Sequence, residues 1–228
     1  MINKVLLVAA TNIEILATIN YLESNFNQKS FTEFSNDKLT ITPFIMGVGI
    51  MQSAFALGRH RKIQDFDLLI HAGISGTYSG SKLNLGDTVE VHEEQFGDIG
   101  AEDRDGKILD LFDLELLGDN QFPFLNRKLI NNSKKYRTKL KQVTGNTVSK
   151  ASGELNTINQ MEMRKADVES MEGASVFYAC RNIDIPFVSI RAISNYVEPR
   201  NKSNWNINLA LDNLNQEIIK ILGELSGK

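Results

Sequence analysis

Several charged and amide side chains follow apolar segments of the chain, where they could act together on a small polar ligand. Glu14 lies four residues after an early apolar run, and Glu172 closely follows a short apolar segment. Arg191 and Asn195 lie within and just after a later apolar segment. A carboxylate can accept a proton from water or hydrogen bonds from hydroxyls, whereas an arginine donates and an amide does both. These residue types favour acid–base chemistry on a polar small molecule.

The elements that must position these side chains alternate between strands and helices. Buried apolar runs predict strands, and apolar residues recurring every three or four positions predict helices. We expect strands at 4–10, 38–44, 66–72, 87–91, 141–148, 168–170 and 187–193, and helices at 15–22, 51–58, 171–181 and 207–222. This order predicts one α/β domain over residues 1–228, with a central mixed, mainly parallel sheet flanked by helices. Ligands of such folds bind beyond the carboxyl ends of the strands.

One long segment breaks this pattern. Residues 93–121 are polar and acidic with little periodicity, and loops of that length are usually functional. Asp98 in this segment is a candidate for closing over a site, and an acidic surface loop is the alternative.

Composition and charge exclude several classes of protein. The chain has 228 residues, 42% hydrophobic and 23% charged, which fits one soluble globular domain. A net charge of -3 without a basic stripe makes nucleic acid an unsuitable partner. The first apolar run is far shorter than the roughly 20 residues that span a membrane and lacks signal-peptide flanks. We therefore expect a cytoplasmic protein with no membrane contact.

Neither a metal nor a cofactor is expected from the residues that usually bind them. Cys180 is the single cysteine, and the three histidines are scattered along the sequence. The turn at 47–49 lacks the third glycine of a dinucleotide-binding motif, since Gln52 occupies that place. Ser75 lacks the last glycine of a nucleophile elbow. His71 lies in an apolar strand, where a hydrogen-bonded core histidine is favoured over a catalytic base.

Two segments about twenty residues apart carry a family resemblance. Residues 168–174 contain Met171-Glu172 before a predicted helix, and residues 186–195 end in Arg191-Ala192-Ile193-Ser194-Asn195. This pairing resembles the nucleoside phosphorylase and nucleosidase superfamily. There, a Met-Glu pair holds the ribose, and the end of the Arg-Ala-Ile-Ser strand holds the purine. Further positions fall at the glycine turns of that superfamily and are implied to contact substrate: Val48, Gly73, Ile74 and Gly76.

The resemblance implies cleavage of a ribose–purine bond through an oxocarbenium-like sugar. Glu172 can accept hydrogen bonds from two ribose hydroxyls and place negative charge near the developing cation. Met171 would form an apolar wall against the ribose. The alternative for Glu172 is a helix N-terminal carboxylate favoured by the helix dipole.

Glu14 matches the place where hydrolytic members of the superfamily carry a glutamate. Its negative charge would repel phosphate and could accept a proton from water, which favours hydrolysis over phosphorolysis. A solvated glutamate in a first helical turn is the alternative. Arg191 would hold the attacking water or Glu14 in line, or serve as a buried structural partner.

Asn195 is the position most informative about the base. Relatives that act on adenine nucleosides have aspartate here, whereas an amide can donate to N7 or to O6 of a 6-oxopurine. Hypoxanthine or guanine is therefore the predicted leaving group. Ser194 would orient Asn195 by a second hydrogen bond, or simply end the strand. Asn156 occupies the position of the purine-stacking aromatic of adenine-specific relatives, and Thr157 beside it is also predicted to contact substrate.

Two further segments, 96–103 and 196–205, resemble the futalosine hydrolases of this superfamily. Their substrate yields hypoxanthine and a ribose with a carboxybenzoyl group, in an alternative route to menaquinone. That aromatic carboxylate would need a cation and a flat apolar surface, for which Arg200, Lys202 and Trp205 are candidates. A solvated loop with a core tryptophan is the alternative. The resemblance also implies a homodimer or higher homo-oligomer.

The function predicted from the sequence is therefore futalosine hydrolysis by Glu14, Glu172, Arg191 and Asn195. Three alternatives stay open. They are a methylthioadenosine/S-adenosylhomocysteine-type nucleosidase, a phosphorolytic purine nucleoside phosphorylase, and a non-catalytic nucleoside-binding protein.

Overall fold

The structure is a computed structural model that describes residues 2–30 and 32–227. Its helices are α1 (Asn12–Asn25), α2 (Gly49–Arg59), α3 (Leu155–Met163), α4 (Gly173–Ile183) and α5 (Ile207–Ser226). Its strands are β1 (Lys4–Ala9), β2 (Asn27–Ser30), β3 (Glu33–Ser35), β4 (Thr40–Ile45), β5 (Leu68–Thr77), β6 (Thr88–Phe96), β7 (Gly100–Glu102), β8 (Ile108–Asp110), β9 (Phe124–Leu125), β10 (Lys128–Ile130), β11 (Lys141–Thr147), β12 (Val168–Ser170) and β13 (Phe187–Tyr196).

The sheet is mixed, as the sequence predicts, and part of it closes on itself. Within the described residues it has 11 strands. Strands β4, β1, β5 and β13 lie side by side in that order, and each consecutive pair of these four is parallel. Strand β13 also pairs with β6, which joins β11, β12 and again β5. These pairings form a ring of strands, so the sheet is bent into a barrel-like shape. The carboxyl ends of β1, β5 and β13 meet at one edge of this ring.

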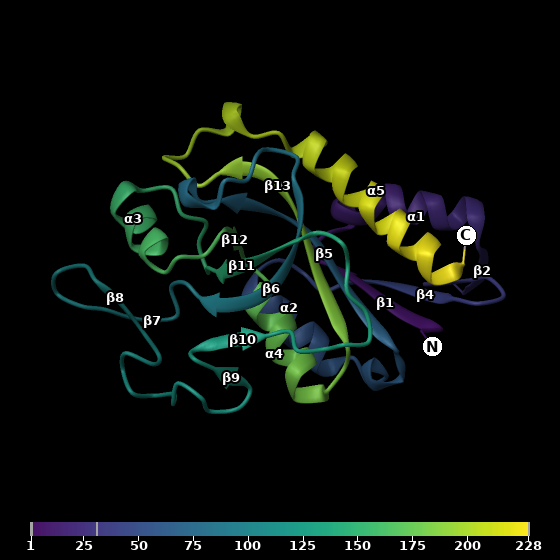
Figure 1. The fold of residues 1–228 in the computed structure, drawn as a ribbon, viewed down its shortest axis with the longest axis horizontal. Coiled ribbons are helices and arrows are strands. Elements are labelled where there is room, and N and C mark those ends of the chain that lie inside the picture. Colours follow the sequence, from purple (N-terminus) through teal and green to yellow (C-terminus); the bar gives the residue numbers. More distant parts are fainter. Residues whose placement is uncertain (1, 31, 228) are drawn as a thin grey trace.

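Helices cover both faces of the sheet (Figure 1). Helices α1 and α5 pack together on one face, and α2 and α4 pack together on the other. Strand β1 serves both cores, because Leu6 and Val8 join one cluster and Val5 and Leu7 join the other. Alternate side chains of a strand point to opposite faces, so a strand with a continuous apolar sequence is buried on both sides.

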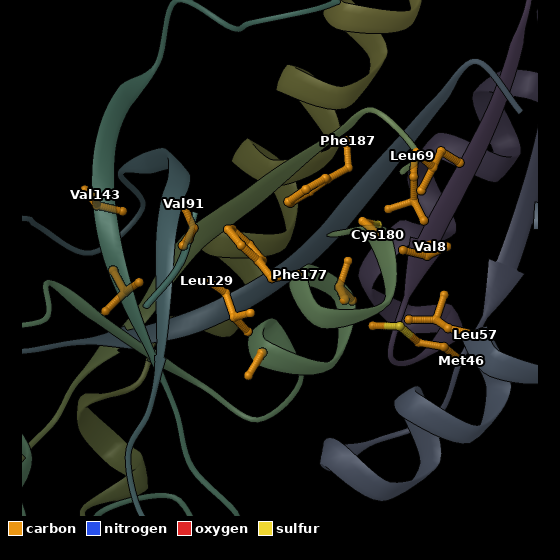
Figure 2. Close-up of a cluster of buried hydrophobic side chains, with 14 of the residues drawn as sticks. Val8, Met46, Leu57, Leu69, Val91, Leu129, Val143, Phe177, Cys180 and Phe187 are labelled. Carbon is orange, nitrogen blue, oxygen red and sulfur yellow. The ribbon is translucent and has the colours of Figure 1, made fainter. Parts of the chain in front are cut away.

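The core between the sheet and α2 and α4 shows how these helices are held. Phe177 and Cys180 of α4 lie among side chains from the strands, including Val8 and Leu69, and Leu57 of α2 lies close by (Figure 2). Each fully buried side chain of the size of Leu or Phe contributes about 1.5–3 kcal/mol to the free energy of unfolding. This packing fixes the start of α4, which carries Glu172.

Strands β5 and β13 extend further than their apolar runs predict. Gly73, Ile74 and Gly76 lie within β5 rather than after its end, and Asn195 lies within β13. The ladder between the two strands continues to the Tyr196–Thr77 pair. Paired backbone groups keep a strand extended even where its side chains turn polar.

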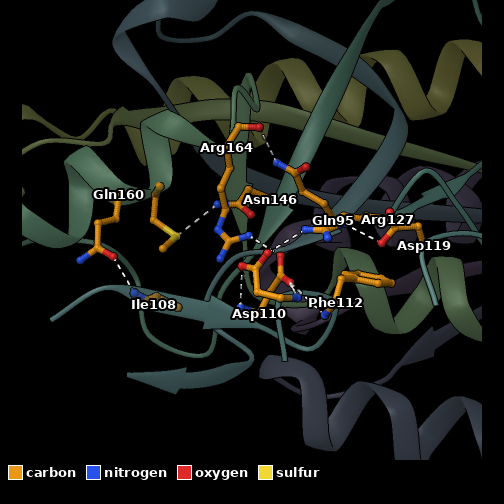
Figure 3. Close-up of polar contacts among 11 residues, drawn as sticks. Gln95, Ile108, Asp110, Phe112, Asp119, Arg127, Asn146, Gln160 and Arg164 are labelled. Atoms are coloured by element: carbon orange, nitrogen blue, oxygen red, sulfur yellow. Dashed lines mark hydrogen bonds and ion pairs between the residues drawn. The ribbon is translucent and has the colours of Figure 1, made fainter. Parts of the chain in front are cut away.

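The long polar segment, expected to be a loop, contains strands. It contains the end of β6 and the β7–β8 hairpin, and its contacts with α3 are drawn in Figure 3. The Arg164 guanidinium lies 2.9 Å from an Asp110 carboxylate oxygen, and Gln95 donates to the Arg164 carbonyl at 3.0 Å. Asp98 accepts hydrogen bonds from the backbone and hydroxyl of Ser149. These contacts tie the segment to neighbouring elements.

Candidate active site

A cleft of about 270 Å³ opens at the edge where β1, β5 and β13 end, beside the starts of α1 and α4. Polar residues predicted to be in the site line this cleft, namely Glu14, Glu172, Ser194 and Asn195. So do the predicted apolar and glycine residues Val48, Ile74, Gly76, Met171 and Trp205. The strand order thus brings together residues that are up to 191 positions apart in the sequence.

Glu14 lies in the first turn of α1 and is 8% exposed. One carboxylate oxygen accepts from the backbone N–H of Thr11 at 2.9 Å and from its hydroxyl at 3.0 Å. The other accepts from the backbone N–H of Ile74 at 3.3 Å. These donors join the start of α1 to β5 and fix the position of both carboxylate oxygens. Glu14 is therefore a fixed carboxylate at the wall of the cleft.

Arg191 lies beneath the cleft and is 1% exposed. It pairs with Gly73 across the β13–β5 ladder, and its guanidinium crosses the space that a side chain at Gly73 would fill. A Cβ there would lie 2.8 Å from Arg191 Nη1 and 3.0 Å from Glu14 Oε1. Glycine at this position thus allows Arg191 and Glu14 to converge. Arg191 and Gly73 do not line the cleft among the described residues, and they support its floor.

Buried carboxylates surround Arg191 and act on its charge. Burial lowers the pKa of Arg191, and the charge of Glu172, followed by those of Glu14 and Glu94, opposes this shift. Arginine stays charged in proteins even so. The guanidinium therefore provides positive charge under a cleft whose walls are acidic.

Glu172 is the N-cap residue of α4 and is 8% exposed. Its Oε1 accepts from the backbone N–H of Gly49, at the start of α2, at 2.7 Å. Burial raises the pKa of Glu172, the charge of Arg191 opposes the rise, and that of Glu14 adds to it. Gly49 has φ +83°, a conformation that favours glycine. Glu172 is thus held between the starts of two helices, with Met171 beside it.

Asn195 is oriented by its neighbour. The Ser194 hydroxyl donates to Asn195 Oδ1 at 2.8 Å, and Asn195 Nδ2 donates to the Tyr196 carbonyl at 3.0 Å. A Cβ at Gly76 would lie 3.0 Å from Asn195 Nδ2, so this glycine leaves room for the amide. With Oδ1 occupied, the second N–H of the amide remains to donate to a ligand.

A smaller cavity of about 70 Å³ adjoins the cleft and shares Gly76, Met171, Asn195 and Trp205 with it. Arg200 lines this cavity, and its guanidinium lies 5.0 Å from the centre of the Trp205 ring. The cavity therefore offers the predicted cation and flat apolar surface. Lys202 is exposed and is not among the described lining residues of either cavity.

The structure does not bring Asn156 and Thr157 to the cleft. They lie in the first turn of α3, whose N-cap residue Glu154 accepts from the backbone N–H of Thr157 at 3.0 Å. The sequence did not predict this helix. Leu155, Ile158 and Met161 recur at three-residue spacing, but a run of nine residues is short for a periodic pattern to be recognised.

Six lining residues were not assigned a role from the sequence, among them Thr11, Ser75 and Glu169. Thr11 holds Glu14, and the Thr-x-x-Glu spacing typical of a helix start could have revealed this. Ser75 is 4% exposed, and its hydroxyl has no hydrogen-bond partner among the described residues. Glu169 accepts from Tyr78 at 2.7 Å and from the Ser152 hydroxyl at 2.6 Å. Only the folded strands place these last two at the cleft.

Within residues 2–30 and 32–227, no group of three His, Cys, Asp or Glu side chains is placed to hold a metal ion. None of the helices described is long and apolar enough to cross a membrane.

Comparison with known proteins places this fold in a family. The model of the phosphorylase superfamily matches residues 5–224. The chain belongs to the phosphorylase superfamily. The resemblance inferred from residues 168–174 and 186–195 is thereby confirmed, together with the nucleoside phosphorylase-like α/β fold.

Two relatives of this chain are named for different substrates. The chain is 28% identical over 189 residues to futalosine hydrolase of Thermus thermophilus, covering 79% of this chain and 80% of that protein. It is 27% identical over 203 residues to 5′-methylthioadenosine/S-adenosylhomocysteine nucleosidase of Colwellia psychrerythraea, covering 81% and 80%. Both relatives are nucleosidases, which are N-glycosyl hydrolases, and this confirms the predicted enzyme class.

Solved structures of the superfamily show the same fold. The futalosine hydrolase of Helicobacter pylori aligns with a TM-score of 0.76 at 14% identity, covering 98% of this chain and 99% of that one. The Colwellia psychrerythraea nucleosidase in complex with adenine aligns with a TM-score of 0.75 at 17% identity, covering 99% and 96%.

Proposed function

We propose that this chain hydrolyses the N-glycosidic bond of futalosine and releases hypoxanthine. The observation that carries the proposal is that Glu14, Glu172 and Asn195 line one cleft. Cleavage of a ribose–purine bond requires a grip on the sugar, a well-placed nucleophile and a stabilised leaving base. These three side chains supply one group for each task.

Glu172 holds the ribose. Its carboxylate is fixed by the Gly49 N–H and faces the cleft, where it can accept hydrogen bonds from the ribose hydroxyls. Its negative charge also stabilises the positive charge that develops on the sugar as the bond to the base breaks. Met171 beside it provides an apolar wall.

Glu14 activates water. Its carboxylate takes a proton from a water molecule whose oxygen bonds to C1′ of the ribose as the bond from C1′ to the base breaks. The Arg191 guanidinium lies with Glu14 in the space left open by Gly73, where its positive charge holds Glu14 and the water in line. The negative charge of Glu14 disfavours phosphate as the nucleophile.

Asn195 stabilises the leaving base. The electron pair of the broken bond passes to the purine, and the amide N–H donates to N7 or O6 as negative charge develops there. Adenine presents an amino donor where hypoxanthine presents O6, so a donating amide favours the 6-oxopurine. Ser194 supports this by occupying Oδ1 of the amide.

The adjoining cavity supports futalosine over a simple nucleoside. Arg200 can pair with the aromatic carboxylate beyond the ribose, and the Trp205 ring offers a flat apolar face. The proposed substrate places the reaction in menaquinone biosynthesis. A cytoplasmic location and a homodimer remain predictions from the sequence.

A second function is favoured by one observation. The 27% identity to a 5′-methylthioadenosine/S-adenosylhomocysteine nucleosidase is close to that of the futalosine hydrolase relative. An enzyme of that kind would also hold the ribose with Glu172 and activate water with Glu14. Asn195 distinguishes the two, since adenine would be poorly matched to it.

The test measures base release from futalosine, inosine and methylthioadenosine by chromatography. Each reaction is run in the presence and in the absence of phosphate. We expect hypoxanthine from futalosine without phosphate, and a kcat/KM for methylthioadenosine lower by about a hundredfold or more. Strict phosphate dependence would contradict hydrolysis. Faster release of adenine would support the methylthioadenosine nucleosidase. Tight nucleoside binding with no base released would support a binding protein.

A further inference from the structure

Arg191 has an unusual set of partners for a buried arginine. None of the ion pairs within 4.0 Å in the described part of the chain includes it, although Glu172, Glu14 and Glu94 all act on its charge. Its shortest hydrogen bond instead runs from Nη2 to Nε2 of His71, at 2.7 Å. A weaker contact joins Nη1 to the Ile190 carbonyl at 3.3 Å. A neutral imidazole thus holds the buried cation.

The strand register builds this contact. Ser189 pairs with His71 and Arg191 pairs with Gly73, so these four residues form a square across β13 and β5. Residues two apart on a strand point to the same face. Since Gly73 has no side chain, the guanidinium can lie across it and reach the imidazole of His71.

The hydrogen-bond partners determine the form of the imidazole. A guanidinium only donates, so Nε2 of His71 must accept and must carry no proton. Nδ1 lies 3.1 Å from the Ser189 hydroxyl, which can accept the proton on that nitrogen, and 3.3 Å from Arg191 Nη2, whose shorter contact is the one to Nε2. Burial, followed by the charge of Arg191, lowers the pKa of His71 well below its usual value of 6.5, which agrees with a neutral ring.

We propose that His71 is a positioning residue that holds the Arg191 guanidinium beside Glu14, with Ser189 fixing the imidazole tautomer. The role rests on the proposed function, because it matters only if Glu14 activates water. Without an acceptor at this place, the guanidinium would turn to pair directly with a nearby carboxylate. An arginine paired to Glu14 would occupy the carboxylate oxygen that has to take the proton from water.

The test compares two amide substitutions that differ only in reach. In His71→Gln the amide oxygen can reach the place of Nε2 and accept from Arg191. In His71→Asn the shorter amide reaches only the place of Nδ1, near Ser189. Base release from futalosine is measured for both, with kcat and KM determined separately. His92→Asn serves as the matched control, since His92 does not line the cleft.

We expect His71→Asn to lower kcat about tenfold to a hundredfold, the effect of losing a hydrogen bond to a charged group. KM should change less than about twofold, because the contacts of Glu172 and Asn195 with the substrate remain. His71→Gln should recover most of the lost kcat. Ser189→Ala should lower kcat about two- to fivefold, and this milder variant serves if His71→Asn does not fold.

Equal kcat values for His71→Asn, His71→Gln and the unchanged protein would overturn the role of His71 and leave the proposed function intact. A loss in His71→Asn that appears as a higher KM alone would also overturn it. If His71→Asn does not fold, an unchanged kcat in Ser189→Ala has the same consequence. An unchanged protein that releases no base from any nucleoside would overturn the proposed function, and this inference with it.

Discussion

The two ends of the cleft are built differently. The inner end is lined by Glu14 and Glu172, with Arg191 beneath it, and the exposed fractions of these side chains are 8%, 8% and 1%. Its carboxylates accept hydrogen bonds from backbone N–H groups of separate elements. At the outer end, the adjoining cavity is lined by Tyr196, the last residue of β13, and by Arg200 and Trp205 on the loop that follows; Tyr196 is 38% exposed.

This difference reflects what each end must do. A buried charge is tolerated only when partners compensate for its lost hydration, and those partners also fix its position. The inner end therefore has the rigid geometry that bond cleavage requires. An exposed arginine on an aromatic ring contributes only about 0.5–1 kcal/mol. The outer end can thus adapt to the substituent of the substrate without disturbing the chemistry.

The largest effect is expected from Glu14→Gln at the inner end. Loss of the group that takes the proton from water should lower kcat about 10²- to 10⁴-fold, while the dissociation constant for substrate stays within a few-fold. Single-turnover kinetics and equilibrium binding measure the two quantities. Glu23→Gln, at an exposed position of the same helix, is the control. Near-normal turnover in Glu14→Gln would refute its assigned role.

Asn195→Asp should change which base is released. An aspartate can accept from the exocyclic amine of adenine, so the ratio of kcat/KM for methylthioadenosine over futalosine should rise about a hundredfold. Competition between the two substrates, followed by chromatography of the bases, measures this ratio. Asn27→Asp, at an exposed position of β2, is the control. An unchanged ratio would show that Asn195 does not select the base.

Arg200→Ala tests the outer end. Removal of this exposed cation should raise KM for futalosine about three- to tenfold and leave KM for inosine unaffected, because inosine lacks the carboxylate. Lys202→Ala is the matched control, since Lys202 lies on the same loop outside both cavities. Equal losses for futalosine and inosine would mean that Arg200 acts on the fold rather than on the substituent.

The smallest effect on turnover is expected at Glu94, which lies behind the inner end. Its Oε1 accepts from the Thr147 hydroxyl at 2.9 Å, and this hydroxyl accepts from the backbone N–H of Ala174 at 2.7 Å. Burial raises the pKa of Glu94 from 4.5 to about 8. The unfolded chain loses this proton first, so the folded protein loses stability as pH rises from 4.5 to 8.

Replacement by a group that does not titrate should remove this loss. The free energy of unfolding of Glu94→Gln, relative to the unchanged protein, should increase by about 1–2 kcal/mol between pH 6 and pH 8. Urea unfolding at the two pH values measures the difference, with Glu23→Gln as the control. A difference that is the same at both pH values would show that Glu94 is ionised in the folded protein.

The sequence predicted the inner end better than the outer parts of the site. Apolar periodicity placed β1, α1 and α5, and the residues after predicted strands included Glu14 and Glu172. Strands such as β9 and β10 and the nine-residue helix α3 are too short for their patterns to be recognised. The helix that carries Asn156 and Thr157 was therefore not predicted.

Side-chain contacts between neighbouring strands could not be predicted from the sequence. The hydrogen bond from Arg191 to His71 depends on the register of β13 against β5, which neither strand specifies alone. The sequence therefore showed His71 only as a buried histidine. The extension of β5 through residues 73–76 was missed because its pairing, rather than its side chains, keeps it extended.

The most direct test of the inner end is to identify the atom that replaces the base. Futalosine is incubated with the protein in ¹⁸O-labelled water containing phosphate, and the sugar product is analysed by mass spectrometry. Activation of water by Glu14 predicts one ¹⁸O atom at C1 of the released sugar and no sugar phosphate. A sugar 1-phosphate without the label would contradict the assignment of water as the nucleophile.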